Sequence, residues 1–188
     1  MARPQQFSKD DIVGAAFTVV RRNGRSALSA RSIARELGSS TMPIYSCMGD
    51  MDGIEEQVAI RSLELILAYQ TRPVTGDAML DFVLGQVNFA QDEPQLYRVI
   101  YLSSDASQQE RKARLSTIGG TRLRAVLSRD PKYASLSPSS MKKLLERALI
   151  FAHGYASLLS LGLTTEMAPD ELRHLAARVI ESSRSDLR

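Results

Sequence analysis

Residues 29–45 read SARSIARELGSSTMPIY, and this stretch decides how the amino-terminal part of the chain is organised. Ser29 is a good helix N-cap, the apolar residues after it recur at helical spacing, and Gly38 is a typical helix end. A second short helix is expected over about 40–46, with Ser40 as its N-cap. A short helix, a glycine turn and another short helix is the spacing of a helix-turn-helix motif.

A further helix is predicted directly before this motif. Ser8 is its N-cap, and apolar residues recur at positions i, i+4, i+7 and i+8 from Ile12. The pair Asn23-Gly24 ends this helix, because glycine readily adopts the left-handed conformation that follows a helix. The sequence therefore predicts an N-terminal three-helix domain over residues 1–50.

Beyond residue 50 the chain is predicted to form longer helices, because no alternating strand pattern and no hairpin signal interrupts the helical spacing. Gly119-Gly120 is expected to weaken the helix that contains it. The fold class is all-α, with about nine helices divided between the helix-turn-helix domain and a helical domain over residues 51–188. The expected helices of this second domain cover residues 50–70, 75–90, 92–102, 107–129, 137–161 and 169–184.

Composition excludes several classes of protein. A single cysteine, Cys47, excludes an internal disulfide framework and a cysteine-rich zinc site. The opening residues MARPQQFSKDD lack the apolar stretch of a secretory signal. Residues 148–165 are uncharged, but their polar residues and two glycines favour a buried helix over a membrane span. We expect a soluble cytoplasmic protein, with no membrane partner.

Positive charge is concentrated in the first quarter of the chain. The net charge is +3 overall, +4 in residues 1–49 and −1 in the rest. Local basicity of this kind suits a surface that faces phosphates, because charge neutralisation and counterion release dominate nucleic-acid affinity. A solvated helical face would carry the same charges, so charge alone leaves both interpretations open.

The second helix of the motif carries the candidate contacts to double-stranded DNA. A helix of this length fits the major groove, while the preceding helix lies across the backbone. Met42 and Pro43 offer apolar surface suited to thymine methyl groups, and the Tyr45 hydroxyl can reach a phosphate. Further hydroxyls and free N–H groups for phosphates or base edges come from Ser39, Ser40 and Thr41.

About the first 55 residues resemble the DNA-binding domain of TetR-type transcriptional regulators. The resemblance is carried by Ile12-x-x-Ala15-Ala16-Phe17, Gly24, Leu28-Ser29-x-Arg31-x-Ile33-Ala34-x-x-Leu37-Gly38, Ile44-Tyr45 and Asp52-x-Ile54. It implies that Ser29 and Tyr45 contact phosphates and that Arg31 reaches the groove. It also implies that Thr41, Met42 and Pro43 occupy recognition-helix positions.

The chain departs from this family pattern after the tyrosine. Family members often have His and an apolar residue there, followed by a lysine that binds phosphate. This sequence has Ser46-Cys47-Met48 instead, and Met51 stands where the lysine is expected. One phosphate contact fewer predicts a weaker salt dependence of DNA binding.

Several singled-out residues have a purely structural alternative. Arg31 can be a surface charge, and Tyr45 can pack in the domain core. Cys47 is expected to be a small buried hydrophobe rather than a redox-sensing thiol. His153 has no metal-ligand spacing to a Cys or acidic residue and is expected in a core or interface. No metal or other cofactor is expected.

A single helix-turn-helix reads few base pairs, so a homodimer that reads two half-sites is expected. The resemblance implies that the last two long helices pair into a four-helix bundle with those of a second copy. A row of small residues and several apolar ones mark the predicted interface, although the same residues can close the core of one chain. They are Ala148, Ala152, Ala156 and Ser160, with Leu159, Leu172, Leu175 and Val179.

The helices between these two regions hold apolar and aromatic residues suited to a small-molecule cavity, or to an ordinary core. The candidate ligand-binding residues are Met79, Phe82, Phe89, Tyr97, Tyr101, Ile118 and His153. A ligand there can act only through different affinities for two arrangements of the recognition helices.

The sequence thus predicts a ligand-responsive DNA-binding regulator, a repressor released from a palindromic operator by an unknown small-molecule effector. No nucleophile elbow, phosphate loop or HExxH pattern is present, so an enzyme is not expected. One alternative is a helical enzyme or small-molecule carrier whose N-terminal helices are structural. Another is a DNA-bound adaptor of the same fold that has no ligand.

Overall fold

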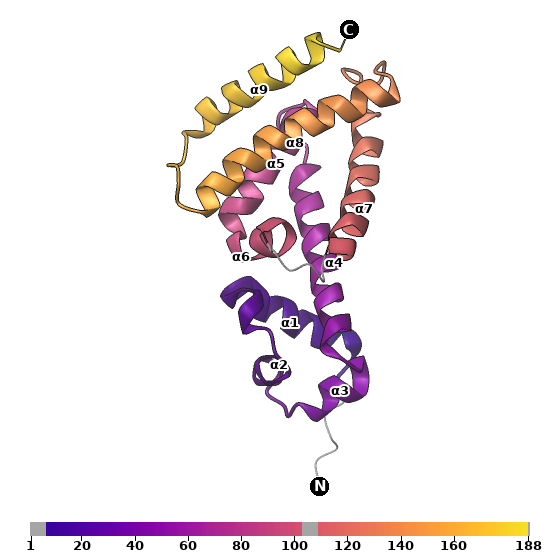
Figure 1. The fold of residues 1–188 in the computed structure, drawn as a ribbon, viewed down its shortest axis with the longest axis vertical. Helices are drawn as coiled ribbons and strands as arrows, with labels where there is room; N and C mark the ends of the chain where they lie inside the picture. Colours follow the sequence, from indigo (N-terminus) through magenta and orange to yellow (C-terminus); the bar gives the residue numbers. More distant parts are fainter. Residues whose placement is uncertain (1–6, 103–108, 188) are drawn as a thin grey trace. The chain divides into compact units, whose positions relative to one another are not determined.

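The computed structural model of the chain describes residues 7–102 and 109–187, although within 109–118 it describes only the side chains of Ala113 and Thr117. Over these residues it contains nine α-helices and no strand (Figure 1). None of these helices is both long enough and apolar enough to cross a membrane. The helices are α1 (Lys9–Asn23), α2 (Ala30–Leu37), α3 (Met42–Met48), α4 (Met51–Gln70), α5 (Ala78–Asp92), α6 (Pro94–Tyr97), α7 (Gln109–Leu127), α8 (Pro138–Ser160) and α9 (Pro169–Ser185).

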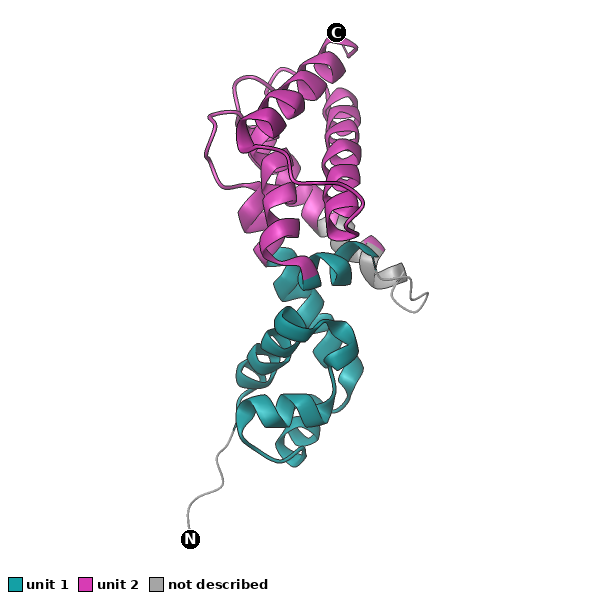
Figure 2. Cartoon of the chain, turned by 90° about the vertical axis from the view of Figure 1, so that its left-hand side faces the viewer, with its two compact units in different colours: residues 1–64, 95–111 teal, residues 65–94, 112–188 magenta. Residues whose placement is uncertain are grey.

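The chain divides into two compact units (Figure 2). Unit 1 is Met1–Glu64 with Gln95–Arg111, and unit 2 is Leu65–Pro94 with Lys112–Arg188. Helix α4 contributes residues to both units. Unit 1 extends beyond the domain boundary that the sequence predicts at residue 50, and it includes a segment from later in the chain.

Most helix ends follow the capping signals in the sequence. Ser8 and Ser29 accept hydrogen bonds from the third backbone N–H of α1 and α2, and Ser137 does the same for α8. Gly38 ends α2 in the left-handed conformation with φ of 64°, which glycine adopts without a steric cost. The predicted all-α fold is confirmed.

Two local predictions are wrong. Helix α3 begins at Met42 with Thr41 as its N-cap, not at Ser40, and Pro43 is therefore its second residue. Proline is tolerated there because the first N–H groups of a helix have no acceptor within the helix. Gly119 and Gly120 lie inside an uninterrupted α7. The start predicted for this helix near Ser107 lies outside the described residues.

The segment predicted as one helix over 92–102 also differs in detail. It divides into the short α6 and a π-helical turn, Arg98–Leu102. A three-residue 3₁₀ turn, Arg25–Ala27, joins α1 to α2.

Unit 1 is organised around α1, which contacts both α2 and α3. Ile12 and Ala16 of α1, Ile33 of α2 and Ile44 of α3 are fully buried. Burial of a large aliphatic side chain contributes about 2 kcal/mol, so the three isoleucines hold the three short helices together.

Unit 2 is organised around α5, which packs against α8 and α9. Met79, Phe82 and Val83 of α5 join a continuous core with residues of α7, α8 and α9. Gly85 lies at a close approach of α5 to α4, because an added Cβ would overlap the Tyr69 carbonyl and lie 2.7 Å from the Gln70 Cα.

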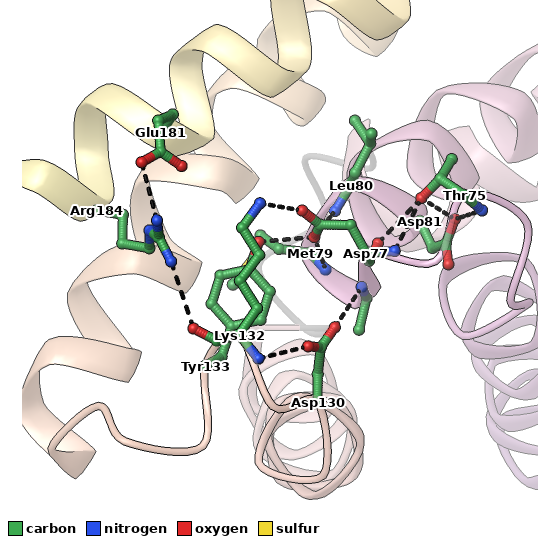
Figure 3. A network of polar contacts seen from close by, with 11 residues as sticks. Thr75, Asp77, Met79, Leu80, Asp81, Asp130, Lys132, Tyr133, Glu181 and Arg184 are labelled. Carbon is green, nitrogen blue, oxygen red and sulfur yellow. Dashed lines mark hydrogen bonds and ion pairs between the residues drawn. The ribbon is translucent and has the colours of Figure 1, made fainter.

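A polar network fixes the start of α5 to the loop between α7 and α8 (Figure 3). The Asp77 carboxylate caps α5 by accepting from the Met79 and Leu80 N–H groups, and it also accepts from Lys132 Nζ and Tyr133 Oη. Burial alone would raise the Asp77 pKa, but the hydrogen bonds from Lys132 and Tyr133 outweigh it and hold this pKa below its ordinary value. The carboxylate therefore stays ionised.

Candidate nucleic-acid interface

Helix α3 has one fully buried side chain and others that are exposed to solvent. Ile44 is fully buried in unit 1, whereas Met42 is 77% exposed and Tyr45 is 52% exposed. Because Met42 and Tyr45 are three residues apart, their side chains lie on the same helix face. The alternative in which Tyr45 packs in the domain core is therefore excluded.

The hydroxyls of the motif fall into two groups. Ser39 Oγ donates to the Ser40 carbonyl at 2.9 Å, and Ser46 Oγ donates to the Pro43 carbonyl at 3.1 Å. The Thr41 side chain makes no capping hydrogen bond, and the Tyr45 hydroxyl faces outward. Ser40, Thr41 and Tyr45 form no side-chain hydrogen bond among the described residues, so their hydroxyls remain available to a ligand.

The arginines of unit 1 differ in whether an acidic residue of the chain already pairs with them. Arg22 pairs with Glu36 at 3.3 Å, and Arg25 pairs with Glu55 at 3.0 Å. Arg31 and Arg35, both on α2, are exposed and form no ion pair among the described residues. These two guanidinium groups can meet phosphates without first breaking an intramolecular pair.

Two of the positions that depart from the TetR pattern, Cys47 and Met51, are half-buried. Cys47 Sγ lies 3.9 Å from the Phe7 carbonyl oxygen, so this thiol is partly covered by the chain itself. Met51 is the first residue of α4 and carries no charge toward a phosphate.

The row of small residues predicted for the dimer interface lies inside unit 2. Ala148, Ala152 and Ala156 are at most 1% exposed, and Leu172 is 6% exposed. Ala148 and Ala152 pack in the core that includes α5, and Leu172 packs beside Val87 and Tyr155. These four residues therefore offer no surface to a second chain. Leu159, Ser160, Leu175 and Val179 are half-buried.

A different face of α8 is apolar and exposed. Ile150 is 73% exposed and Leu158 is 44% exposed, and Gly154 lies between them at the same spacing of four residues. We call Leu149, Ile150, Leu158 and Leu161 the outer face of α8; all four are exposed. The sequence contained a signal for this exposed apolar face, because residues 148–165 carry no charge and a helix over them can be apolar on two faces.

His153 lies beside this outer face. It is half-buried on α8, four residues after Leu149 and four before Ser157. Burial lowers the His153 pKa below its ordinary value, because the charged form is less well solvated.

The predicted ligand-binding residues that the structure describes are divided between the two units. Met79, Phe82 and Phe89 are at most 1% exposed and fill the interior of unit 2. Tyr97 and Tyr101 belong to unit 1, where their rings lie 5.0 Å apart. The Ile118 side chain lies outside the described residues. Aromatic residues at helical spacing here form core, which is the alternative that the sequence left open.

Unit 2 instead has a groove of about 530 Å³ on α4, α5 and the start of α9. None of the six predicted residues whose side chains are described lines it. Its apolar lining includes Leu84 and Leu172, and the Tyr69 hydroxyl within it donates to Asp92 at 3.1 Å. Sequence reasoning missed this groove because its walls come from segments far apart in the chain. Among the described residues, no cluster of three His, Cys, Asp or Glu side chains is arranged to hold a metal ion.

Comparison with known proteins supports the fold. No protein-family model matches the chain. An uncharacterised HTH-type transcriptional regulator of Mycobacterium tuberculosis is 30% identical over 84 residues, which cover 45% of this chain and only 38% of that protein. A structure from Vibrio parahaemolyticus, described as a transcriptional regulator of the TetR family, matches with a TM-score of 0.67 at 17% identity, over 94% of this chain and 96% of its own. The resemblance to TetR-type regulators is thereby confirmed at the level of the fold.

Proposed function

We propose that this chain is a DNA-binding transcriptional regulator of the TetR type, and that α3 is its recognition helix. The observation that carries the proposal is the arrangement of α3. One buried isoleucine holds the helix in unit 1, while Met42 and Tyr45 face outward and two unpaired arginines lie on α2.

The dimensions of α3 suit this role. Seven helical residues span about 10 Å, and a helix of ordinary width fits the major groove, which is about 12 Å wide. In this proposal Arg31 reaches the groove, and Ser29 and Tyr45 contact phosphates on either side of it. Ser39, Ser40, Thr41, Met42 and Pro43 complete the proposed DNA-facing surface.

The test uses a duplex that the full-length chain itself selects from a random-sequence pool. We expect Arg31→Ala combined with Tyr45→Phe to weaken binding at least tenfold, because charged contacts to DNA each contribute about 1 kcal/mol or more. Arg178→Ala is the control, since Arg178 is an exposed cation on α9. If the double variant remains folded and binds as tightly as the wild type, the assignment of the motif is wrong.

We further propose that the chain acts as a homodimer joined through the outer face of α8. A second copy of the chain can cover these four exposed apolar residues, which lie on α8 or directly after it. Gly154 leaves room for the two α8 helices to approach closely. A two-fold dimer would read two half-sites of a palindromic operator.

Response to a small-molecule effector and repression by operator occupancy are also proposals. The groove on α4, α5 and α9 supports a ligand site, because its volume lies within the range of about 300–1,000 Å³ usual for such sites. Helix α4 has residues in both units, so a ligand that shifts α4 can change operator affinity.

A small-molecule screen separates this proposal from an adaptor without a ligand. The expected result is a compound that raises the melting temperature of the free protein and also releases it from the selected duplex. A broad screen that yields no such compound would favour the adaptor.

A further inference from the structure

We propose that α3 reads its operator chiefly through the methyl groups of thymine, and that Met42 makes this contact. This inference rests on the proposed function and specifies the class of DNA sequence that the same surface recognises. It follows from which side chains α3 presents and which it lacks.

Helix α3 has no side chain that can pair with a base through two hydrogen bonds. Its sequence is MPIYSCM, without Arg, Lys, Asn, Gln, Asp or Glu. Bidentate recognition of guanine or adenine in the major groove uses Arg, Lys, Asn or Gln. Direct readout by α3 must therefore use its hydroxyls or its apolar surface.

The hydroxyls are mostly occupied or peripheral. Ser46 Oγ already donates to the Pro43 carbonyl. Tyr45 carries the remaining hydroxyl of α3 at the end of a long rigid ring, which suits a phosphate at the edge of the groove better than a base beneath the helix.

Met42 has the exposure and chemistry for an apolar contact. Its side chain is 77% exposed on the same face as Tyr45, and its flexible thioether adapts to irregular apolar surfaces. The thymine C5 methyl is the apolar group that distinguishes a base-pair edge in the major groove. The partner is DNA rather than an apolar protein surface, because exposed Arg31 and Arg35 on α2 form no ion pair among the described residues and residues 1–49 carry a net charge of +4.

The test removes the methyl group from the DNA and then the side chain from the protein. The probe is the tightest duplex that the full-length chain selects from a random-sequence pool. Each thymidine of a half-site is replaced in turn by deoxyuridine, which retains base pairing and lacks only the methyl. At one or two positions per half-site we expect wild-type affinity to fall about fourfold, the effect of about one buried methyl group.

The protein variants complete a double-mutant cycle between the side chain and the methyl group. In Met42→Ala the affinity for the thymidine duplex falls, and deoxyuridine causes no further loss at those positions. Val74→Ala is the matched control, because Val74 is 64% exposed on unit 2, and it should retain the full loss.

Two results would overturn the inference while leaving the proposed function intact. One is a selected duplex that binds equally well with deoxyuridine at every position. The other is a Met42→Ala protein that keeps the full deoxyuridine penalty. Failure to select any duplex would instead overturn the proposed function, and this inference with it.

Discussion

Asp77 joins the start of α5 to the loop between α7 and α8 through several hydrogen bonds. Its carboxylate caps α5 and accepts from Lys132 and from the Tyr133 hydroxyl at 2.6 Å. Tyr133 is fully buried, and burial together with Asp77 raises the Tyr133 pKa far above its ordinary value. The tyrosine therefore stays protonated and donates to Asp77 at every ordinary pH.

Replacing Asp77 by Ala is expected to lower the free energy of unfolding by about 3 kcal/mol. About 1 kcal/mol comes from the lost N-cap, and the rest from a buried hydroxyl left without its acceptor. Urea unfolding measures the loss. Asp186→Ala removes a more exposed carboxylate that pairs with Arg147, and it should change stability by no more than about 0.5 kcal/mol.

The pH dependence of this contribution has a definite sign. The folded-state pKa of Asp77 lies below the ordinary value of 3.8, so its ionised form stabilises the fold above that pH. The difference in stability between wild type and Asp77→Asn should be constant from about pH 7 to 5, and should shrink as pH falls below about 4. A difference that grows with acidification would contradict the described contacts.

Met51 tests the departure from the family pattern at the first residue of α4. Met51→Lys should restore a phosphate contact and steepen the plot of log affinity against log salt by about 0.9. Ala177→Lys on α9 adds the same charge at an exposed position of unit 2 and should leave that slope unchanged. An unchanged slope for Met51→Lys would mean that no phosphate lies near this position.

At the residue scale, the sequence indicated which residues lie on the short helices but not which side chains are already paired. It placed Met42 and Tyr45 on one short helix, which is α3 in the structure, but it did not reveal which arginines form ion pairs. The pairing of Arg25 with Glu55 joins residues thirty positions apart, which no local pattern indicates. The N-cap of α3 was misplaced because Ser39, Ser40 and Thr41 are consecutive residues that can each cap a helix.

At the element scale, the crossing of α4 and α5 depends on one glycine. Gly85→Ala should lower the free energy of unfolding by several kcal/mol, because its Cβ would meet backbone atoms that cannot move aside. Gly120→Ala in α7 is the matched control. Its Cβ would touch only the mobile end of Arg124 at 3.7 Å, so it should raise stability by about 0.5–1 kcal/mol. Thermal or urea unfolding compares the two variants.

The outer face of α8 is tested by a single charge. Ile150→Glu should convert the proposed dimer to a monomer in sedimentation velocity, because burying an unpaired carboxylate in an apolar interface is costly. Lys143→Glu changes the charge at an exposed polar position of the same helix and should remain dimeric. A dimer that survives Ile150→Glu would place the interface elsewhere.

The helices themselves were predictable because caps, glycines and prolines are local signals. Which helices pack against each other was not predictable from the sequence. The row Ala148, Ala152, Ala156 correctly indicates close packing, but spacing cannot distinguish a helix of the same chain from one of a second copy. The aromatic residues of α5 were predicted to line a cavity for the same reason, and they fill the core instead.

At the scale of the whole molecule, the N-terminal quarter and the rest of the chain differ in the sign of their net charge. The first 49 residues carry +4, and the remainder carries −1. This division was readable from the sequence, because charge is a property of composition. The extent of unit 1 was not readable, because residues 95–111 join it through contacts far apart in the chain.

The central claim is that α3 lies in the groove of DNA, and Cys47 allows it to be measured directly. Cys47 is the only cysteine of the chain and lies on α3, so an iron–EDTA reagent attached to its thiol marks the DNA nearest this helix. On the selected duplex we expect two clusters of strand cleavage, centred about one helical turn or a multiple of it apart. The same reagent on Cys47→Ser with Ala177→Cys should cut little. Uniform cleavage from Cys47, or localised cleavage only from position 177, would contradict the account.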